Sequence, residues 1–535
     1  MTKFLLGLLF CPALVIAQSA ETSGGKKEEG AASWEGFREK FVCPEWFADA
    51  KFGIWAHWGA QSVPDWGGGW YARHMYMPDP GRETFGKRAY PWHLKTYGHP
   101  SEVGFKDVIH QWKAERFEPE KLLSYFKGLG ARYFVAMANH HDHFDNFDSS
   151  HHEWNSVRVG PKRDIIGEWG EATRKVGLPF GVSSHDDRFL DWWLAAFSAD
   201  QEGPLRGVPY DGRMTMEDGK GKWWEGLDPV KLYGLPPEKR SAEWVESVGR
   251  NFADRHLELV TKYQPDFLWF DGYGFPYGKY GREVCTELYR QSLAQHGVIK
   301  AVVCGKFTDE PSTIRDIERG VAEGILKQPW QGTTTFTSWF LKKDKEMKHD
   351  ARSLAEVLMD IVSKNGNFLL SVEMRPDGTI PEEHRRELDA FGAWLSANAE
   401  AVYGTRPWKV HGDNLHSIQR RLAAELIGEA DLQAAAKNTS GHFNERTKLS
   451  EPYGADEVRF TTHGERFFVT VLNPRKGALR LSTLGVNGAG VVKKAWQLVG
   501  GKVVPFEQTE KELILHVPGV SGEMPLILEL EKSGE

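Results

Sequence analysis

Between residues 34 and 408, short apolar runs alternate with longer stretches in which apolar residues recur at helical spacing. Helical patterns lie at 119–128, 243–263 and 353–363. The apolar runs have the character of buried parallel strands, and they lie at 52–56, 133–137, 180–183, 267–270, 302–304 and 368–372. This alternation predicts an α/β fold, a (β/α)8-type barrel over residues 34–408. A doubly wound sheet has the same pattern and remains the alternative.

Beyond residue 408 the pattern changes to a period of two, which is typical of strands with one buried face. The alternating segments lie at 458–461, 466–472, 479–482, 512–517 and 526–530. They predict a C-terminal antiparallel β-sandwich over residues 456–535. Residues 409–455 are polar apart from an Ala- and Leu-rich helical pattern near 422–436, and we interpret them as a linker or insertion.

The first residues have the features of a signal peptide. Lys3 precedes an apolar run at 4–16, and Ala17 completes a small-residue cleavage pattern, so we expect residues 1–17 to be removed and the chain to be exported to the periplasm or beyond the cell. A membrane anchor is the alternative, although the run is short for a bilayer. Residues 18–33 are rich in Gly, Lys, Glu and Ser and predict a flexible leader. No later segment is apolar enough to predict a membrane span.

Composition narrows the class of function. A length of 535 residues predicts one large domain with a smaller one, and the net charge of -7 argues against nucleic acid as a partner. The 21 Trp and 20 His exceed common usage, and both residue types suit sugars: indole faces stack on C–H surfaces and imidazoles bond hydroxyls. Cleavage leaves Cys43, Cys285 and Cys304, which have neither metal-ligand spacing nor the pattern of a disulfide framework.

Polar residues follow the predicted strands where a barrel enzyme builds its site. His57, His140, His141, His185 and Asp271 each stand at or just after the end of such a run. Asp271 ends a hydrophobic strand, so its carboxylate would be held rigidly at the barrel top, as the nucleophile of a retaining glycosidase requires. Taken alone, a strand-end Asp is equally typical of a helix N-cap. The paired histidines leave a metal site open as an alternative, although we expect no metal.

Several segments, in order along the chain, resemble those of glycoside hydrolase family 29, the α-L-fucosidases. They are KFGIWAHWG at 51–59, WYAR at 70–73, HHD at 140–142, FDS at 147–149, WNS at 154–156, GPKRD at 160–164, WFDG at 269–272, VSKNGN at 362–367, PDGT at 376–379 and YGTRPW at 403–408. The ordered set is specific, although each segment alone is weak. The resemblance implies a barrel, a C-terminal sandwich and hydrolysis of terminal fucosyl linkages without a cofactor.

The resemblance also implies roles for individual residues. Asp271 matches the family nucleophile, and Arg319 looks like the arginine near the ring oxygen and the nucleophile. The residues that match the sugar-holding set are His57, Trp70, His140, His141 and Trp269. We add His185 to that set because it follows the third predicted strand.

Two departures from the family pattern concern the chemistry. Many members have an acidic residue where this chain has Gly69, which weakens the assignment of the sugar. Many also have a Glu, the acid/base in some of them, where this chain has Gln331, and an amide cannot transfer a proton. Glu318 is therefore our leading candidate for the acid/base, followed by Glu323 and Glu373, although Glu318 could instead only orient Arg319.

The sequence thus predicts an exo-acting retaining α-L-fucosidase that acts on fucosylated oligosaccharides or glycoconjugates. The alternatives are a hydrolase of a modified or related sugar, such as a sulfated fucose, and a fucose-binding protein that has lost hydrolysis. The insert at 200–237, rich in Gly, Trp and charge, is expected to shape the side of the pocket that holds the leaving group. The sequence does not predict the oligomeric state.

Overall fold

The computed structural model describes residues 33–66, 68–81, 87–342, 346–415, 447, 453–518 and 524–533. The predicted signal peptide at 1–17, the leader up to residue 32 and the helical pattern near 422–436 lie outside these residues. Within the described chain, no helix has the length and apolar character needed to cross a membrane.

Eight parallel strands close into a barrel in chain order. They are β1 (Phe52–Ala56), β2 (Phe134–Asn139), β3 (Phe180–Ser184), β4 (Phe267–Phe270), β5 (Val302–Gly305), β6 (Ile314–Glu318), β7 (Trp330–Thr335) and β8 (Gly366–Ser371). Closure is made by β1, which pairs with β2 on one side and with β8 on the other, where Phe52 lies opposite Phe368. The predicted barrel is confirmed, and the doubly wound alternative is wrong.

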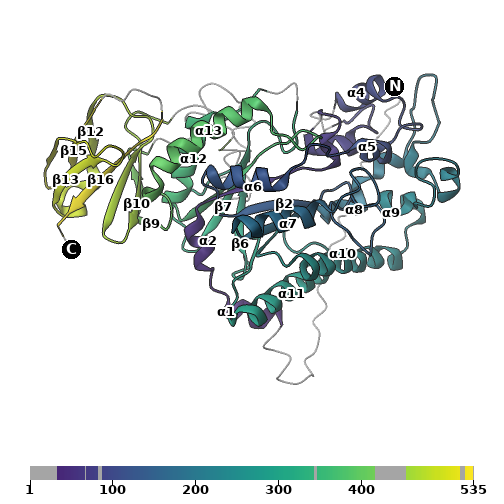
Figure 1. Cartoon of the computed structure of the whole chain (residues 1–535), viewed down its shortest axis with the longest axis horizontal. Helices are drawn as coiled ribbons and strands as arrows, with labels where there is room; N and C mark the ends of the chain where they lie inside the picture. The colour runs from purple at the N-terminus through teal and green to yellow at the C-terminus, as the bar shows by residue number, and fades with distance from the viewer. Residues whose placement is uncertain are drawn as a thin grey trace, which may run out of the picture.

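Helices lie between the barrel strands along the chain, and longer ones such as α10 and α11 run along the outside of the barrel (Figure 1). They are α1 (Trp34–Lys40), α2 (Glu45–Ala50), α3 (Tyr71–His74), α4 (Ala89–Thr96), α5 (Phe105–Gln111), α6 (Pro119–Gly128), α7 (Ile165–Val176), α8 (Phe189–Trp192), α9 (Pro229–Tyr233), α10 (Ala242–Tyr263), α11 (Lys279–His296), α12 (Ala351–Ser363) and α13 (Glu382–Ala397). The longest, α10, begins where the Ser241 side chain accepts a hydrogen bond from the Trp244 amide, and it ends at Gln264 in the left-handed conformation.

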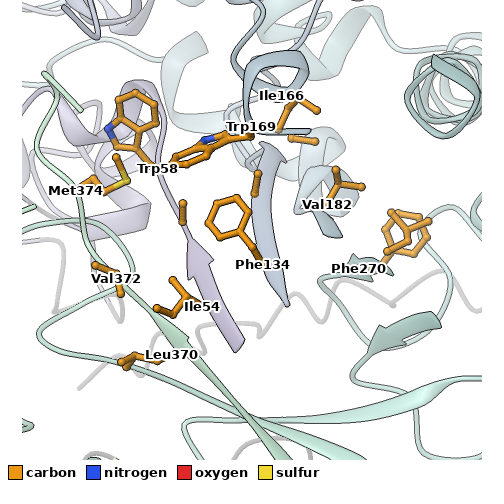
Figure 2. Packing of buried hydrophobic residues seen from close by; sticks show 14 of the residues in the cluster. Ile54, Trp58, Phe134, Ile166, Trp169, Val182, Phe270, Leu370, Val372 and Met374 are labelled. Carbon is orange, nitrogen blue, oxygen red and sulfur yellow. The ribbon is translucent and has the colours of Figure 1, made fainter. Parts of the chain in front are cut away.

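The strands bury both faces, and alternate residues belong to different layers. Ile54 and Phe134 point outward, where the Phe134 ring lies 4.7 Å from that of Trp169 in α7 (Figure 2). Trp55 and Val135, one residue along from these, are paired across the strands and belong to a separate apolar cluster inside the barrel. A barrel filled by its own side chains is rigid, so it holds the residues at its strand ends in fixed positions.

Two strands, β6 and β7, were not predicted, because the barrel interior is polar where they pair. Asp316 of β6 and Gln331 of β7 lie opposite each other, and the Gln331 amide donates to the Asp316 carboxylate at 2.9 Å. The Tyr133 hydroxyl donates to the Gln331 oxygen, also at 2.9 Å. These buried polar groups satisfy one another, so the strands need no continuous apolar run.

The C-terminal region forms two antiparallel sheets that enclose one apolar core, as predicted. The strands are β9 (Arg406–Asp413), β10 (Val458–His463), β11 (Arg466–Val471), β12 (Gly477–Leu481), β13 (Val492–Gln497), β14 (Phe506–Gln508), β15 (Leu513–Val517) and β16 (Leu526–Lys532), with the short helix α16 (Val486–Ala489). β9 begins at Arg406, before residue 409, where we predicted that the linker starts. It is an edge strand with mostly polar, half-exposed side chains, so its sequence lacked the alternation that marked the others.

Candidate active site

A pocket of about 530 Å³ lies at the carboxyl ends of the barrel strands. The predicted nucleophile, the leading acid/base candidate and all the predicted sugar-holding residues contribute to its wall, as does Arg319: they are Asp271, Glu318, His57, Trp70, His140, His141, His185, Trp269 and Arg319. The wall also includes residues that we did not predict, namely Trp55, Gly69, Arg188, Tyr273, Lys306, Ser338, Trp339 and Lys342. Residues far apart in the sequence therefore meet in one cavity because they come from the carboxyl ends of different strands and from the segments that follow them.

Asp271 directly follows β4 and is almost fully buried. Its Oδ1 accepts a hydrogen bond from the Gly272 amide at 2.8 Å. Gly272 has a φ of +85°, and a Cβ there would lie 2.5 Å from an oxygen of Asp187, so only glycine allows this turn. No helix starts at Asp271, since α11 begins at Lys279, so the alternative role as a helix N-cap is wrong.

A lysine holds Asp271 in its ionised form. Lys306, which directly follows β5, donates from Nζ to Asp271 Oδ1 at 2.6 Å. Burial opposes a charge on Asp271, but the Lys306 ammonium and the hydrogen bond from His141 outweigh it and hold the pKa of Asp271 well below its usual value. An ionised carboxylate at the top of the barrel is the form that a nucleophile needs.

Glu318 is the last residue of β6, and it faces Asp271 across the same lysine. Its Oε2 lies 2.6 Å from Lys306 Nζ, so this oxygen and Oδ1 of Asp271 are separated by no more than twice that distance. Retaining glycosidases place their two carboxyl groups about 5 to 5.5 Å apart, whereas inverting enzymes leave room for a water. The short separation fits the retaining arrangement.

The other two acid/base candidates do not line the pocket. Glu323 is exposed. Glu373 is fully buried behind the wall, where its Oε1 accepts from the amides of Thr337 and Ser338 at 2.6 and 3.0 Å. Among the pocket residues, all of which are described, Asp271 and Glu318 supply the only carboxylates.

The pocket histidines divide into two electrostatic types. Burial holds the pKa of His57 and of His140 well below the usual value and that of His185 at about 3, so these rings are neutral. Burial also disfavours charge on His141, but the nearby carboxylates of Asp187 and Asp271 raise its pKa to about 9. Within the described chain, neither ring nitrogen of His57 has a hydrogen-bond partner, which leaves both available to a hydroxyl in the pocket.

Arg319 contacts Glu318, the residue before it. Its guanidinium lies 3.6 Å from Glu318 Oε1, and the ring of Trp339 is near it, with the same Oε1 accepting from Trp339 Nε1 at 3.1 Å. Asp271 is contacted by the ammonium of Lys306. Arg319 is thus placed to act on the second carboxylate.

The two departures from the family pattern have different structural consequences. Gln331 is fully buried inside the barrel and does not line the pocket, so its amide leaves the pocket wall unchanged. Gly69 does line the pocket, and a Cβ there would lie 3.3 Å from both His140 and Phe340. A side chain at position 69 would therefore press on the ring of His140.

Asp271 and two of its neighbours have the ligand types and spacing of a group that could hold a metal ion. Ligand atoms of His141, Asp187 and Asp271 lie within 4.8 Å of one another. His141 lies 3.4 Å from Asp187 and 3.3 Å from Asp271, and these carboxylates raise its pKa to about 9. The three groups form ion pairs in this structure.

The insert at 200–237 lies elsewhere than we expected. All of its residues are described, and none of them lines the pocket. It is anchored by Asp211, which accepts hydrogen bonds from the hydroxyls of Tyr76 and Tyr233, both at 2.6 Å. This buried anchor holds the insert against the preceding segments of the barrel domain.

A (β/α)8 barrel whose strand ends bring two facing carboxylates together with neutral histidines and indole rings defines a sugar-cleaving hydrolase. The family model described as alpha-L-fucosidase matches residues 17–400. The tissue alpha-L-fucosidase of Rattus norvegicus is 27% identical over 414 residues, which cover 76% of this chain and 79% of that protein. The tissue alpha-L-fucosidase of Homo sapiens is 27% identical over 377 residues, 69% of this chain and 70% of that protein.

Solved structures of fucosidases have a similar fold. The alpha-fucosidase of Thermotoga maritima has a TM-score of 0.64 and 25% identity, over 93% of this chain and 99% of that one. The same enzyme in complex with fucose, at 24% identity, also has a TM-score of 0.64, over 93% and 99% of the two chains, and shows the shared fold. The chain belongs to the α-L-fucosidase family of glycoside hydrolases.

Proposed function

We propose that this protein is an exo-acting, retaining α-L-fucosidase that removes terminal fucosyl groups from oligosaccharides or glycoconjugates. The observation that carries the proposal is the pair of carboxyl groups, Asp271 and Glu318, held at retaining separation by one lysine. Family relatives and structural neighbours named as fucosidases support the choice of sugar.

In this reaction Asp271 attacks the anomeric carbon while Glu318 gives a proton to the leaving oxygen, and a covalent glycosyl-enzyme forms. Glu318 then takes a proton from the water that releases fucose. The neutral rings of His57, His140 and His185 bond hydroxyls of the sugar, and Trp70 and Trp269 pack against its apolar side.

The second candidate is a hydrolase of a modified fucose, and Gly69 favours it. Where many relatives have an acidic side chain, this chain has none, which removes both a negative charge and a contact with sugar hydroxyls. We also propose that the chain is exported, because residues 1–17 have the features of a signal peptide.

The proposal is tested by release of nitrophenol from 4-nitrophenyl α-L-fucoside. We expect Asp271→Ala to lower kcat by roughly 10⁴-fold or more, because the nucleophile is lost. We expect Glu318→Ala to retain the first step with this good leaving group but to release fucose slowly, and added azide should restore turnover with an α-fucosyl azide product.

Asp309→Ala, at an exposed position, serves as the matched control and should match the wild type. Pure, folded wild type that binds fucose without releasing nitrophenol would instead indicate a binding protein. Turnover of a sulfated fucoside alone would indicate the second candidate.

A further inference from the structure

Lys306 has an arrangement that the proposed reaction does not by itself require. Its ammonium lies 2.6 Å from an oxygen of each of the two carboxyl groups, Asp271 and Glu318, and its side chain is only 9% exposed. The Nζ also lies 5.9 and 5.8 Å from the ring centroids of Trp269 and Tyr273. Cation–π attraction to these rings helps to keep the charge between the carboxyl groups.

Each carboxyl group uses its remaining oxygen for a different donor. Asp271 Oδ2 lies 3.3 Å from His141 Nε2. Glu318 Oε1 accepts from Trp339 Nε1 at 3.1 Å and lies 3.6 Å from Arg319. Both carboxyl groups therefore contact Lys306. By contrast, His141 contacts Asp271, and Trp339 and Arg319 contact Glu318.

The chemistry of retention explains why one shared cation is suitable. Before the first step, Asp271 is ionised and Glu318 carries the proton. The bond from C1 to the leaving oxygen then breaks, a bond from C1 to Asp271 forms, and the Glu318 proton goes to the leaving oxygen. Now Asp271 is an uncharged ester and Glu318 is ionised. In the second step water gives its proton to Glu318, its oxygen bonds to C1, and Asp271 leaves as a carboxylate.

The pair thus carries one negative charge before the first step, in the intermediate and after the second step. That charge is on Asp271 at the start, on Glu318 in the intermediate and on Asp271 again at the end. We propose that Lys306 is the shared counter-ion of this charge, stabilising it on Asp271 for attack and on Glu318 for activation of water. The inference rests on the proposed retaining function. It predicts that loss of the lysine charge slows both chemical steps, whereas a counter-ion of the nucleophile alone would affect mainly the first.

The two steps can be measured separately with 2-deoxy-2-fluoro-α-L-fucosyl fluoride. The fluorine at C2 slows both steps, and the fluoride leaving group needs little protonation, so the covalent intermediate accumulates. The rate of inactivation then reports attack by Asp271. The rate at which activity returns after removal of excess reagent reports water activation by Glu318, and it is measured only on molecules that were folded and active.

We expect Lys306→Met to slow inactivation and reactivation each by roughly 100-fold, the usual effect of removing one electrostatic stabiliser. Lys306→Gln, which can still donate hydrogen bonds but has no charge, should slow both steps to a similar extent. Lys306→Arg, which keeps the charge, should remain within roughly 10-fold of the wild type in both. The acidic limb of the kcat/KM profile of Lys306→Gln should also move to higher pH, because the charge that favours ionised Asp271 is gone.

Lys300→Met is the matched control, since Lys300 lies exposed just before the opposite end of β5, and it should change neither rate. Lys306→Gln that slows only inactivation, or neither step, would overturn the inference. A wild type that neither hydrolyses the nitrophenyl fucoside nor is labelled at Asp271 would overturn the proposed function instead. If Lys306→Met does not fold, as judged by thermal unfolding, the comparison of Lys306→Gln with Lys306→Arg decides the matter.

Discussion

His141 is the pocket histidine that carries a positive charge at neutral pH, and its neighbours explain why. It lies between Asp187, at 3.4 Å, and Asp271, at 3.3 Å, and these carboxylates raise its pKa to about 9. The adjacent ring of His140 contacts the amide of Gln61 at 2.7 Å instead, and burial leaves it neutral. Two histidines that are consecutive in the sequence thus have opposite electrostatic roles.

The charge on His141 makes stability depend on pH. Its pKa in the folded chain lies above the unfolded value of about 6.5, so its contribution is fully present below pH 6.5 and is lost as the pH rises through about 9. We expect Asp187→Asn to lower the free energy of unfolding by on the order of 1 kcal/mol at pH 6 and by much less above pH 9.5. Chemical unfolding at the two pH values measures this difference.

Asp191→Asn, at an exposed position close in sequence to Asp187, should show no such dependence on pH. An effect of Asp187→Asn that is equal at pH 6 and pH 9.5 would mean that the His141 charge is not what Asp187 stabilises.

At the level of single residues, the carboxylates, histidines and indoles of the pocket could be predicted because they lie at or after predicted strand ends or in segments that resemble those of the family. It could not single out Lys306, because lysine is common and most lysines are solvated. The available signal was its position directly after the predicted strand at 302–304, the place where the other strands carry their functional residues. The contact between Arg319 and Glu318 was one of the alternatives, but it depends on the turn after β6, where Arg319 has a φ of +47°, and sequence pattern does not specify that turn.

At the level of elements, the segment after β7 completes the pocket, and it is held from behind by a residue that follows β8. Ser338 and Trp339 line the pocket, and Trp339 donates to Glu318. Glu373, buried two residues beyond β8, accepts from the Thr337 and Ser338 amides. Glu373 therefore positions Glu318 indirectly, through the backbone that holds Trp339.

We expect Glu373→Ala to lower the free energy of unfolding by about 1 to 3 kcal/mol, because two buried amides lose their acceptor. It should also lower kcat/KM for the nitrophenyl fucoside by roughly 10-fold or more, because Trp339 is no longer held against Glu318. Thermal unfolding and steady-state kinetics measure the two effects.

Trp339→Phe should lower kcat/KM without the same loss of stability, and adding it to Glu373→Ala should have little further effect on rate if both act through one contact. Glu383→Ala, exposed on α13, is the control. Fully additive rate losses in the double variant would show that Glu373 acts on the reaction by another route.

The elements also show where sequence patterns fail. Six barrel strands were predictable because both of their faces are apolar, whereas β6 and β7 place Asp316, Gln331 and Thr333 on the inner face. These buried polar side chains satisfy one another by hydrogen bonds; for example, Thr333 donates to Asp316 at 3.2 Å. A rule based on apolar runs cannot detect a strand whose inner face is satisfied by polar partners.

At the level of the whole molecule, the barrel and the C-terminal sandwich are joined through α12 and α13, which lie between them in Figure 1. α12 packs against β9 and β10. The junction contains a buried ion pair in which Arg459 of β10 donates to Asp360 of α12 at 2.6 Å, and Lys364 contacts the other oxygen of Asp360 at 2.8 Å. Burial opposes a charge on Asp360, but these cations hold its pKa well below the usual value.

We expect Arg459→Met to lower the free energy of unfolding by about 3 kcal/mol or more, because it leaves a buried carboxylate with one partner fewer. Activity of the folded protein at 25 °C should change little, since no described residue of the sandwich lines the pocket. Calorimetry should show the two parts unfolding in more separate transitions than in the wild type.

Arg480→Met removes an exposed pair with Glu512 and should cost no more than about 1 kcal/mol. A large fall in kcat/KM of folded Arg459→Met at 25 °C would show that the sandwich influences the pocket.

The closure of the barrel sets when, during synthesis, the pocket can exist. β1 pairs with β8, so the ring is complete only after Phe368 has been synthesised and has paired with Phe52. The groups that line the cavity come from nearly every strand between them. A nascent chain that has emerged from the ribosome as far as Lys342, beyond β7 but short of β8, contains every pocket residue, yet it has no closed ring to hold them in place. Enzymatic activity is therefore itself a report that the last barrel strand has been made and has docked.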